Sequence, residues 1–214
     1  MADLTLVIGD KNLSSWSLRP WLALRQAGIP FQEQKVLLDL PTSRADLKKY
    51  SPTGLVPVLK DGDRIIWESL AILEYLNDQF PDKNLWPSDA GARAHARSIS
   101  CEMHAGFDNL RTVWPMAIVR EGLKHLTTGG VQRDIDRILA LWQEALETYG
   151  NKSSDPFLYG SFSIADAMYA PVVSRFRTYG PVGTSPETAA WMDAVWSSPA
   201  MQEWVNGAME EVAT

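Results

Sequence analysis

The chain has 214 residues, a formal net charge of −6 and a hydrophobic fraction of 45%. This length favours one large or two small domains, and the charged fraction of 21% excludes a globally disordered chain. The negative charge argues against nucleic acid or an anionic membrane as the main partner. With no signal-peptide pattern and no apolar run near the about 18 residues of a membrane span, the sequence predicts a soluble cytoplasmic protein. Cys101, the single cysteine, is expected to be a small buried hydrophobic residue.

The first 80 residues alternate between strand and helix patterns. The apolar run at 4–8 predicts a short buried strand, and a periodic run from Leu18 predicts a helix that ends near Gly28. We expect Pro20 in the first turn of this helix, where a missing N–H is tolerated. The other expected elements are a polar edge strand at 31–38, a short irregular helix within 41–50, strands at 55–59 and 65–67 joined by the hairpin signal Asp61-Gly62, and a helix at 70–80. This order predicts a small α/β unit with mixed strand directions.

The rest of the chain is predicted to be helical. The expected elements are a helix over 92–122 kinked at Pro115, a loop at 125–130, a helix at 133–149, a helix at 167–176 and two short helices after Ser185 and Ser198. Ser163-Ile164-Ala165-Asp166 is a capping-box pattern, and the run after it is apolar on nearly all sides. We therefore expect a buried helix at the centre of an all-helical unit.

Three short stretches of the α/β unit are candidates for chemistry. Ser14 and Ser15 precede the first helix, where free N–H groups and the helix dipole attract an anion. A serine hydroxyl there can hold an anionic oxygen or sulfur, although such serines are most often N-caps. Pro57 lies inside an expected strand, which an edge position would explain. Glu68-Ser69 opens another helix, where an exposed charge and a cap are the ordinary explanation.

Taken together, these stretches resemble the cytosolic glutathione transferase family, and the resemblance covers essentially the whole chain. Residues 54–59, Gly-Leu-Val-Pro-Val-Leu, are similar to the family's glycine-x-valine-proline strand with a cis proline. Residues 68–76 are similar to its Glu-Ser helix start, and residues 163–166 to the capping box of its buried helix. The resemblance implies a two-domain α+β fold: a thioredoxin-like α/β domain at 1–80, a linker at 81–90 and an all-α domain at 91–214.

The resemblance also implies that glutathione lies along the first domain as co-substrate, without a metal ion. The γ-glutamyl end of glutathione would meet Glu68 and Ser69, and the cysteinyl part would pair with the Val56 backbone beside cis Pro57. Ser14 would be the catalytic residue, donating a hydrogen bond to the glutathione sulfur and lowering the pKa of a thiol that is about 8.5 when free.

The first helix resembles those of serine-type bacterial, zeta-like and tau-like members. Ser15 and Arg19 are possible catalytic support. Trp16 stands where zeta-type isomerases usually carry a cysteine, which puts that isomerase activity in doubt. Leu55 stands where many members have Lys or Gln. One of three basic residues would then bind the glycyl carboxylate of glutathione, and the sequence does not distinguish among Arg44, Lys48 and Lys49.

A second substrate would bind between the domains, where the resemblance offers Trp16, His104, Phe107 and Arg111. Phe107 is better explained as core, and Arg111 with Asp108 as a solvated or paired face. We interpret the chain as a homodimeric glutathione transferase that adds glutathione thiolate to a small electrophile, with no nucleic-acid or membrane partner. The alternatives are a glutathione-dependent isomerase similar to maleylacetoacetate isomerase, and a non-catalytic glutathione transferase-like binding module.

Overall fold

A four-stranded mixed sheet with strand order β2-β1-β3-β4 forms the centre of the N-terminal domain. The computed structural model describes residues 4–38, 41–123, 127–150 and 155–213. The strands are β1 (Leu4–Ile8), β2 (Gln32–Lys35), β3 (Val58–Asp61) and β4 (Arg64–Trp67). β1 pairs with β2 in parallel and with β3 antiparallel, and β4 returns antiparallel to β3. Every residue of β2 is exposed, as expected for the polar edge strand.

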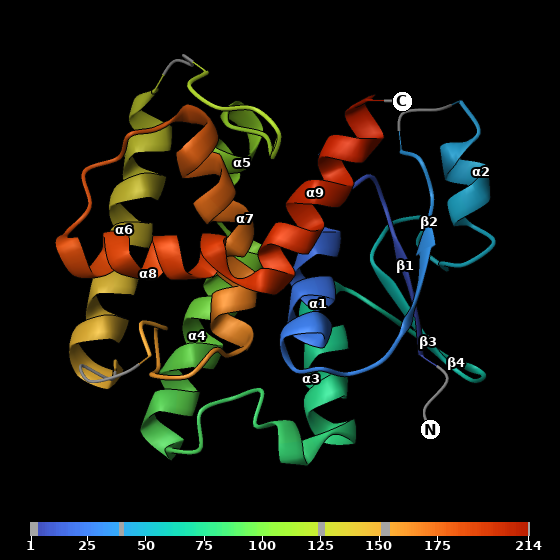
Figure 1. The fold of residues 1–214 in the computed structure, drawn as a ribbon, viewed down its shortest axis with the longest axis horizontal. Helices are drawn as coiled ribbons and strands as arrows, with labels where there is room; N and C mark the ends of the chain where they lie inside the picture. The colour runs from blue at the N-terminus through green and yellow to red at the C-terminus, as the bar shows by residue number, and fades with distance from the viewer. Residues whose placement is uncertain (1–3, 39–40, 124–126, 151–154, 214) are drawn as a thin grey trace.

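Helices cover both faces of this sheet, with α2 on one side and α1 and α3 on the other (Figure 1). These helices are α1 (Ser15–Gln26), α2 (Ser43–Leu47) and α3 (Ser69–Gln79). Leu6 joins the main core with α1 and α3, whereas the adjacent Val7 packs with Val58 and Leu47 on the α2 side. β1 is therefore buried on both faces, which explains its continuous apolar run. The order βαβαββα is the thioredoxin-like arrangement that the sequence predicted.

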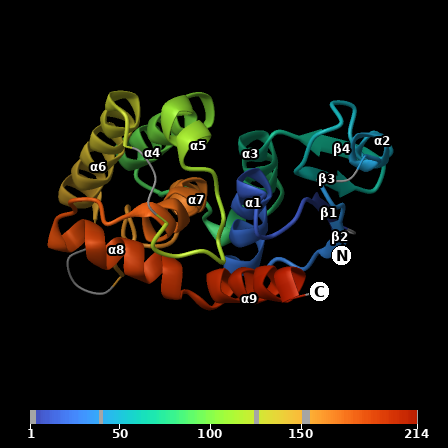
Figure 2. The same cartoon turned by 90° about the horizontal axis from the view of Figure 1, so that it is seen from above.

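An all-helical domain follows α3. A 3₁₀ turn η1 (Pro81–Lys83) leads to α4 (Ala90–Ala105), α5 (Asp108–Val113), α6 (Gly129–Tyr149), α7 (Ile164–Tyr179), α8 (Pro186–Ser197) and α9 (Pro199–Ala213). α7 lies at the centre of this domain, and α9 runs back alongside α1 of the first domain (Figures 1 and 2). The main core is continuous across both domains. Within the described part of the chain, no helix combines the length and apolar character that crossing a membrane would need.

Side-chain caps start the C-terminal helices where the sequence predicted them. Ser163 and Asp166 form the capping box of α7, and nearly all of this helix is buried. Ser185 accepts a hydrogen bond from the Thr188 N–H at 3.2 Å, and Ser198 accepts one from the Met201 N–H at 3.4 Å. α8 and α9 each begin at the proline after the capping serine, and they extend over 12 and 15 residues.

The first helix begins earlier than the periodicity predicted. α1 starts at Ser15, so Pro20 lies inside the helix rather than in its first turn. The whole stretch from Ser15 to Leu24 is tightly packed, apart from the half-buried Trp16. Tertiary packing therefore overrides the local preference that would place a proline at the helix start.

The predicted helix over 92–122 is wrong, because the chain breaks before Pro115. α4 ends at Ala105, and Phe107 adopts a left-handed backbone with φ of +61° before the short α5 begins. Gly106 is a poor helix former, and a Cβ at this position would lie 2.9 Å from the Glu102 carbonyl oxygen. Pro115 therefore follows the end of α5 instead of kinking a continuous helix.

Two smaller predictions also need correction. Thr128 caps α6 by accepting a hydrogen bond from the Val131 N–H, so Gly129 and Gly130 are helical rather than loop. Residues 125 and 126 of that predicted loop lie outside the described residues. Cys101 is exposed rather than buried. It lies two residues from each of the core residues Ile99 and Met103, and side chains two apart on a helix do not share a face.

Candidate active site

The cis proline and the Glu-Ser helix start meet at one cavity of about 290 Å³ in the N-terminal domain. The residues lining it are Trp16, Thr53, Leu55, Val56, Pro57, Trp67, Glu68 and Ser69. The Val56–Pro57 bond is cis, as expected. β3 begins only at Val58, so Pro57 precedes the strand and withholds no N–H from its ladder.

The start of α3 presents an unused hydroxyl to this cavity. Glu68 has a φ of +69°, a conformation uncommon for a non-glycine residue, and it directs the chain into the helix at Ser69. The Ser69 side chain is fully buried, and its Oγ has no hydrogen-bond partner among the described residues. A buried unpaired hydroxyl is costly, and first-turn N–H groups lie beside it. This combination can bind a carboxylate.

Ser14 occupies the N-cap position of α1, but its side chain makes no capping hydrogen bond. Instead Ser14 Oγ donates to Ser17 Oγ at 2.7 Å, and Ser17 Oγ also accepts the Gly9 N–H at 3.1 Å. The N-cap explanation therefore does not account for the hydroxyl of Ser14. Its side chain is 6% exposed, and it is not among the described residues that line either cavity of the site.

Ser15 faces a second cavity, of about 500 Å³, between the two domains. The residues lining it are Leu13, Ser15, Trp16, Asp108, Arg111, Thr112, Pro115, Met116 and Arg175. Ser15 Oγ accepts a hydrogen bond from Arg175 Nη2 at 3.4 Å. Arg111 forms an ion pair with the exposed carboxylate of Asp108. The cavity thus joins the start of α1 to two arginines of the helical domain.

Trp16 lines both cavities and is surrounded by cationic and polar groups. The Arg19 guanidinium lies 4.2 Å and that of Arg111 5.2 Å from the indole centroid. The His104 ring meets the indole edge-on at 5.3 Å. Trp16 is therefore the shared wall of the two cavities, held by cation–π contacts.

Arg19 and Arg175 are buried charges near the start of α1. Arg19 Nε donates to the Met168 carbonyl at 3.1 Å, and its Nη1 has no partner within the described structure. Arg175 Nε donates to the Trp114 carbonyl at 2.8 Å. Burial, then repulsion from Arg175 and Arg111, lowers the pKa of Arg19 to about 9. Burial first and Arg111 second lower the pKa of Arg175 to about 10. Both side chains stay protonated at neutral pH and favour a bound anion.

His104 and Phe107 have different surroundings. His104 Nε2 lies 3.5 Å from Glu68 Oε2. This histidine therefore lies beside the start of α3, which lines the smaller cavity. Burial and the positive charge of Arg19 are the largest influences that lower the pKa of His104, with Glu68 acting in the opposite direction. Phe107 is 8% exposed and belongs to the main core.

Both halves of the chain match models of one protein family. Residues 13–79 match the glutathione S-transferase N-terminal domain, and residues 102–206 match the glutathione S-transferase C-terminal domain. The chain belongs to the glutathione S-transferase family. The cis proline, the Glu-Ser helix start and the serines of α1 all fall within the first of these domains.

Two curated relatives and one solved structure each match at least 76% of the chain. Glutathione S-transferase GstB of Escherichia coli K12 is 25% identical over 207 residues, covering 94% of this chain and 97% of its own. A probable maleylacetoacetate isomerase of Caenorhabditis elegans is 29% identical over 164 residues, covering 76% and 74%. A glutathione transferase homologue from Burkholderia GL BGR1, crystallised with bound glutathione, has a TM-score of 0.73 at 21% identity and covers 97% and 99%.

Two residues of this candidate site were missed from the sequence. Ser17 bonds Ser14, and Arg175 bonds Ser15 across 160 positions of sequence. The sequence offers one indication for Arg175: a charged residue inside a nearly all-apolar helix is rarely buried unless it has polar partners. Ser17 carried none beyond its place in the serine-rich stretch.

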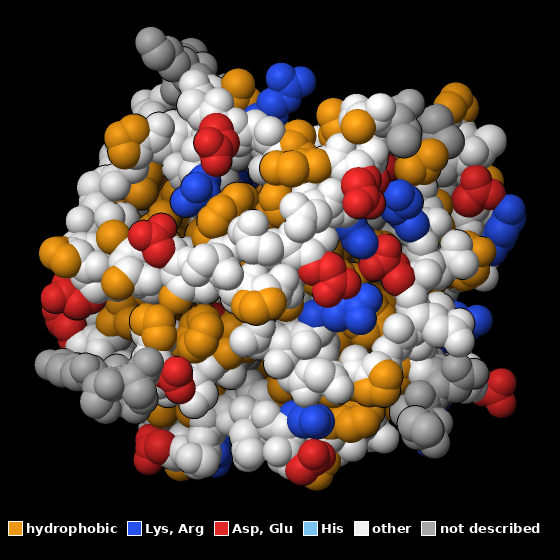
Figure 3. All heavy atoms as spheres, viewed as in Figure 1, with side chains coloured by type: hydrophobic (Ala, Val, Ile, Leu, Met, Phe, Trp, Pro, Cys, Tyr) orange, Lys and Arg blue, Asp and Glu red, His pale blue; other side chains and the backbone are white. Residues whose placement is uncertain are grey.

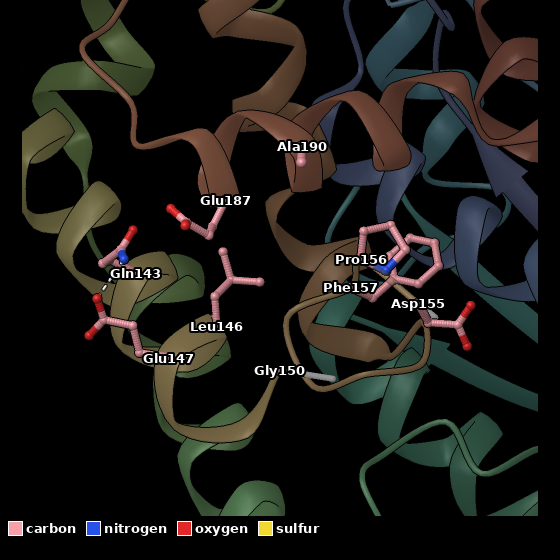
Figure 4. Close-up of a pocket in the computed structure, with 9 residues that line it drawn as sticks. All are labelled: Gln143, Leu146, Glu147, Gly150, Asp155, Pro156, Phe157, Glu187 and Ala190. Carbon is pink, nitrogen blue, oxygen red and sulfur yellow. Dashed lines mark hydrogen bonds between the residues drawn. The ribbon is translucent and has the colours of Figure 1, made fainter. Parts of the chain in front are cut away.

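Another large cavity, of about 520 Å³, lies between α6, α8 and the segment 155–157 (Figure 4). Its walls carry the carboxylates Glu147, Asp155 and Glu187 around the apolar Leu146 and Phe157. Glu147 also accepts a hydrogen bond from Gln143 at 2.6 Å. A wall of like negative charges repels an anionic ligand, so this cavity is a poor candidate for glutathione.

Proposed function

We propose that this protein is a serine-type glutathione transferase, in which a hydroxyl at the start of α1 stabilises glutathione thiolate for attack on a small electrophile. The observation that carries the proposal is the unpaired, buried Ser69 hydroxyl at the start of α3, beside cis Pro57. Such a hydroxyl fits the γ-glutamyl carboxylate of glutathione at the positive end of a helix dipole. Glu68, which lines the same cavity, would bind the α-ammonium of the same γ-glutamyl group.

The cysteinyl part would pair with the Val56 backbone, which directs the thiol toward α1. Ser14 is our candidate for the hydrogen bond to the sulfur, and Ser15 is its neighbour on the interdomain cavity. Arg19 and Arg175 are buried cations close to this position, and positive charge lowers the pKa of a thiol. The Escherichia coli relative is named a glutathione S-transferase, which is consistent with this chemistry.

The glycyl carboxylate needs a cation at the other end of the smaller cavity. Lys49 already pairs with Asp46 at 2.6 Å. Lys48 Cγ lies 3.4 Å and Arg44 Cγ 4.0 Å from the position that a Cβ on Gly54 would take, next to the cavity residues Thr53 and Leu55. We therefore favour Lys48 or Arg44 for this contact.

A glutathione-dependent isomerase is the second candidate, because Arg111 and Arg175 line the interdomain cavity. Only one carboxylate, that of Asp108, is among the described residues lining it, so the cavity fits an electrophile that carries its own carboxylate. The Caenorhabditis elegans relative, a probable maleylacetoacetate isomerase, is named for such a substrate. In an isomerase the thiolate adds to a double bond and later leaves, so glutathione is not consumed.

Turnover assays separate these two activities. A panel of neutral aryl halides and epoxides is compared with carboxylate-bearing enediones, and free glutathione is titrated at the end of each reaction. Consumption of glutathione with an adduct as product supports the transferase. Product formation with glutathione fully recovered supports the isomerase, and we expect Arg111→Gln then to raise KM for the carboxylate substrate by about tenfold, the worth of one charge-assisted hydrogen bond.

Ser69→Ala should weaken glutathione binding. A capping-type hydrogen bond to the γ-glutamyl carboxylate is worth about 0.5–2 kcal/mol, so the dissociation constant should rise by roughly 2- to 30-fold. Isothermal titration calorimetry measures this change. Ser98→Ala is the control, because Ser98 is an exposed serine whose hydroxyl bonds only the Ala94 carbonyl of its own helix in the described structure. Equal affinities for Ser69→Ala and wild type would remove Ser69 from the site.

A further inference from the structure

The loop that carries the candidate catalytic serine is tied to the last helix of the chain. Residues 9–14 connect β1 to α1, and the Ser14 N–H bonds the Asp10 carbonyl at 2.8 Å to close a turn within this loop. Glu211, near the end of α9, accepts the Lys11 N–H at 2.7 Å and the Asn12 N–H at 3.4 Å through Oε2. Its other oxygen, Oε1, pairs with Lys35 at 3.0 Å.

One face of α9 supplies these contacts. Trp204 is fully buried, and its Nε1 donates to the Lys11 carbonyl at 2.8 Å. Glu211 lies seven residues further on, two helical turns along the same face. Gly207 lies between them, and a Cβ there would come within 2.8 Å of Lys11 Cδ. α9 therefore holds both the N–H and the C=O of Lys11 and leaves room for its side chain.

The opposite side of the loop is held by the segment after α5. The Ile118 N–H bonds the Asn12 carbonyl at 3.2 Å, and the Val119 N–H bonds Asn12 Oδ1 at 3.3 Å. Backbone groups on both sides of Asn12 are thus fixed by the helical domain, although the loop itself belongs to the N-terminal domain. Charged side chains cluster over the surface where α9 meets that domain (Figure 3).

The geometry points to Glu211 and Trp204 as positioning residues for the catalytic hydroxyl, which α9 holds in place through the backbone of Lys11 and Asn12. This inference rests on the proposed function of Ser14. Glu211 is the stronger contact, because a carboxylate that accepts backbone N–H groups forms charge-assisted hydrogen bonds and its side chain is only 11% exposed. Loss of that contact frees the loop two to three residues before Ser14.

Glu211→Ala is the direct test. Since displacement of a reacting group by about 1 Å can cost on the order of 100-fold in rate, we expect a fall in kcat of about tenfold or more. KM for glutathione should stay near its wild-type value, because Glu211 is not among the described residues that line the cavity of the cis proline and Ser69. The pKa of the bound glutathione thiol, measured by thiolate ultraviolet absorbance, should rise toward the free value.

Glu203→Ala is the matched control, because Glu203 also lies on α9 and pairs with Arg25 of α1 at 3.2 Å without contacting the loop. It should leave kcat and the bound thiol pKa unchanged. Trp204→Phe keeps an aromatic ring but removes the hydrogen bond to Lys11, and Glu211→Gln keeps the side-chain volume. Both should shift kcat and the thiol pKa in the same direction as Glu211→Ala, which gives a result even where the alanine variant folds poorly.

Three outcomes would overturn the inference. One is a wild-type thiol pKa and kcat in Glu211→Gln and Trp204→Phe, and another is an equal effect of Glu203→Ala. The third is a rise in KM for glutathione with kcat unchanged, which would indicate a binding defect. If the thiol pKa of glutathione bound to the wild-type protein equals that of free glutathione, the proposed function fails as well. If the wild-type protein lowers the thiol pKa and the Glu211 and Trp204 variants lower it equally, only the proposed role of α9 is wrong.

Discussion

Asp166→Ala should lower the free energy of unfolding by about 3 kcal/mol or more. The Asp166 side chain is fully buried and accepts hydrogen bonds from the N–H groups of Leu158 and Ser163 at 3.1 and 2.8 Å. It also accepts from Ser163 Oγ at 2.9 Å and from Trp191 Nε1 at 2.8 Å. Alanine leaves these buried donors unpaired, and each costs about 1–3 kcal/mol. Denaturant unfolding followed by tryptophan fluorescence measures the change.

Ser185→Ala sets the scale for this experiment. Ser185 caps α8 much as Ser163 caps α7, but it lies on a partly exposed helix start, so its loss should cost only about 1 kcal/mol. Glutathione affinity of the folded Asp166→Ala protein should equal that of wild type, because Asp166 lines neither cavity of the site. If Asp166→Ala and Ser185→Ala lower the free energy of unfolding equally, the buried hydrogen bonds of Asp166 contribute no more than an ordinary cap.

Ser14→Ala should raise the thiol pKa of bound glutathione by about 1–2 units. A hydrogen bond to a charged acceptor is worth about 1.5–3 kcal/mol, and one pKa unit is about 1.36 kcal/mol. The dipole of α1 contributes less, roughly 0.3–1 kcal/mol. Turnover near neutral pH should fall by about 10- to 100-fold, because the rate follows the thiolate fraction, while affinity for glutathione stays nearly unchanged. Steady-state kinetics against pH measures both effects.

Ser15→Ala is the matched comparison, since the two serines are adjacent and similarly buried. We expect a smaller shift from Ser15→Ala, because many family members carry a proline at the second position of this block and so have no hydroxyl there. Ser15→Ala also removes a hydrogen-bond partner of the buried Arg175, so a smaller shift from this variant is a stringent result. A larger effect of Ser15→Ala would move the catalytic assignment by one residue and leave the enzyme proposal intact.

Most of the fold was readable from the sequence because its signals are local. Alternating and continuous apolar runs predicted the strands, and serines followed by proline or by a capping box predicted the starts of α7, α8 and α9. The start of α1 and the break at Gly106 were not predicted correctly. The start of α1 depends on how the segment packs against the rest of the molecule, whereas the break falls at a poor helix former, Gly106. A pattern of three- and four-residue steps records neither.

The site was predictable only where motifs carried it. Pro57, Glu68 and Ser69 were recognised from short motifs, and all three line one cavity. The contact of Ser15 with Arg175 depends on how two domains pack, and no local pattern encodes it. The same is true of Glu211, which lies 200 positions from Lys11 and reads in the sequence as an ordinary acidic residue near the end of an amphipathic helix.

The most direct test of thiolate stabilisation is the titration of glutathione bound to the wild-type protein. The ultraviolet absorbance of the thiolate is recorded against pH for the complex and for free glutathione under the same conditions. We predict a midpoint at least one unit below that of free glutathione, and a midpoint in the Ser14→Ala complex that returns most of the way to it. A wild-type complex that titrates like free glutathione would contradict the proposal and would favour a non-catalytic binding module.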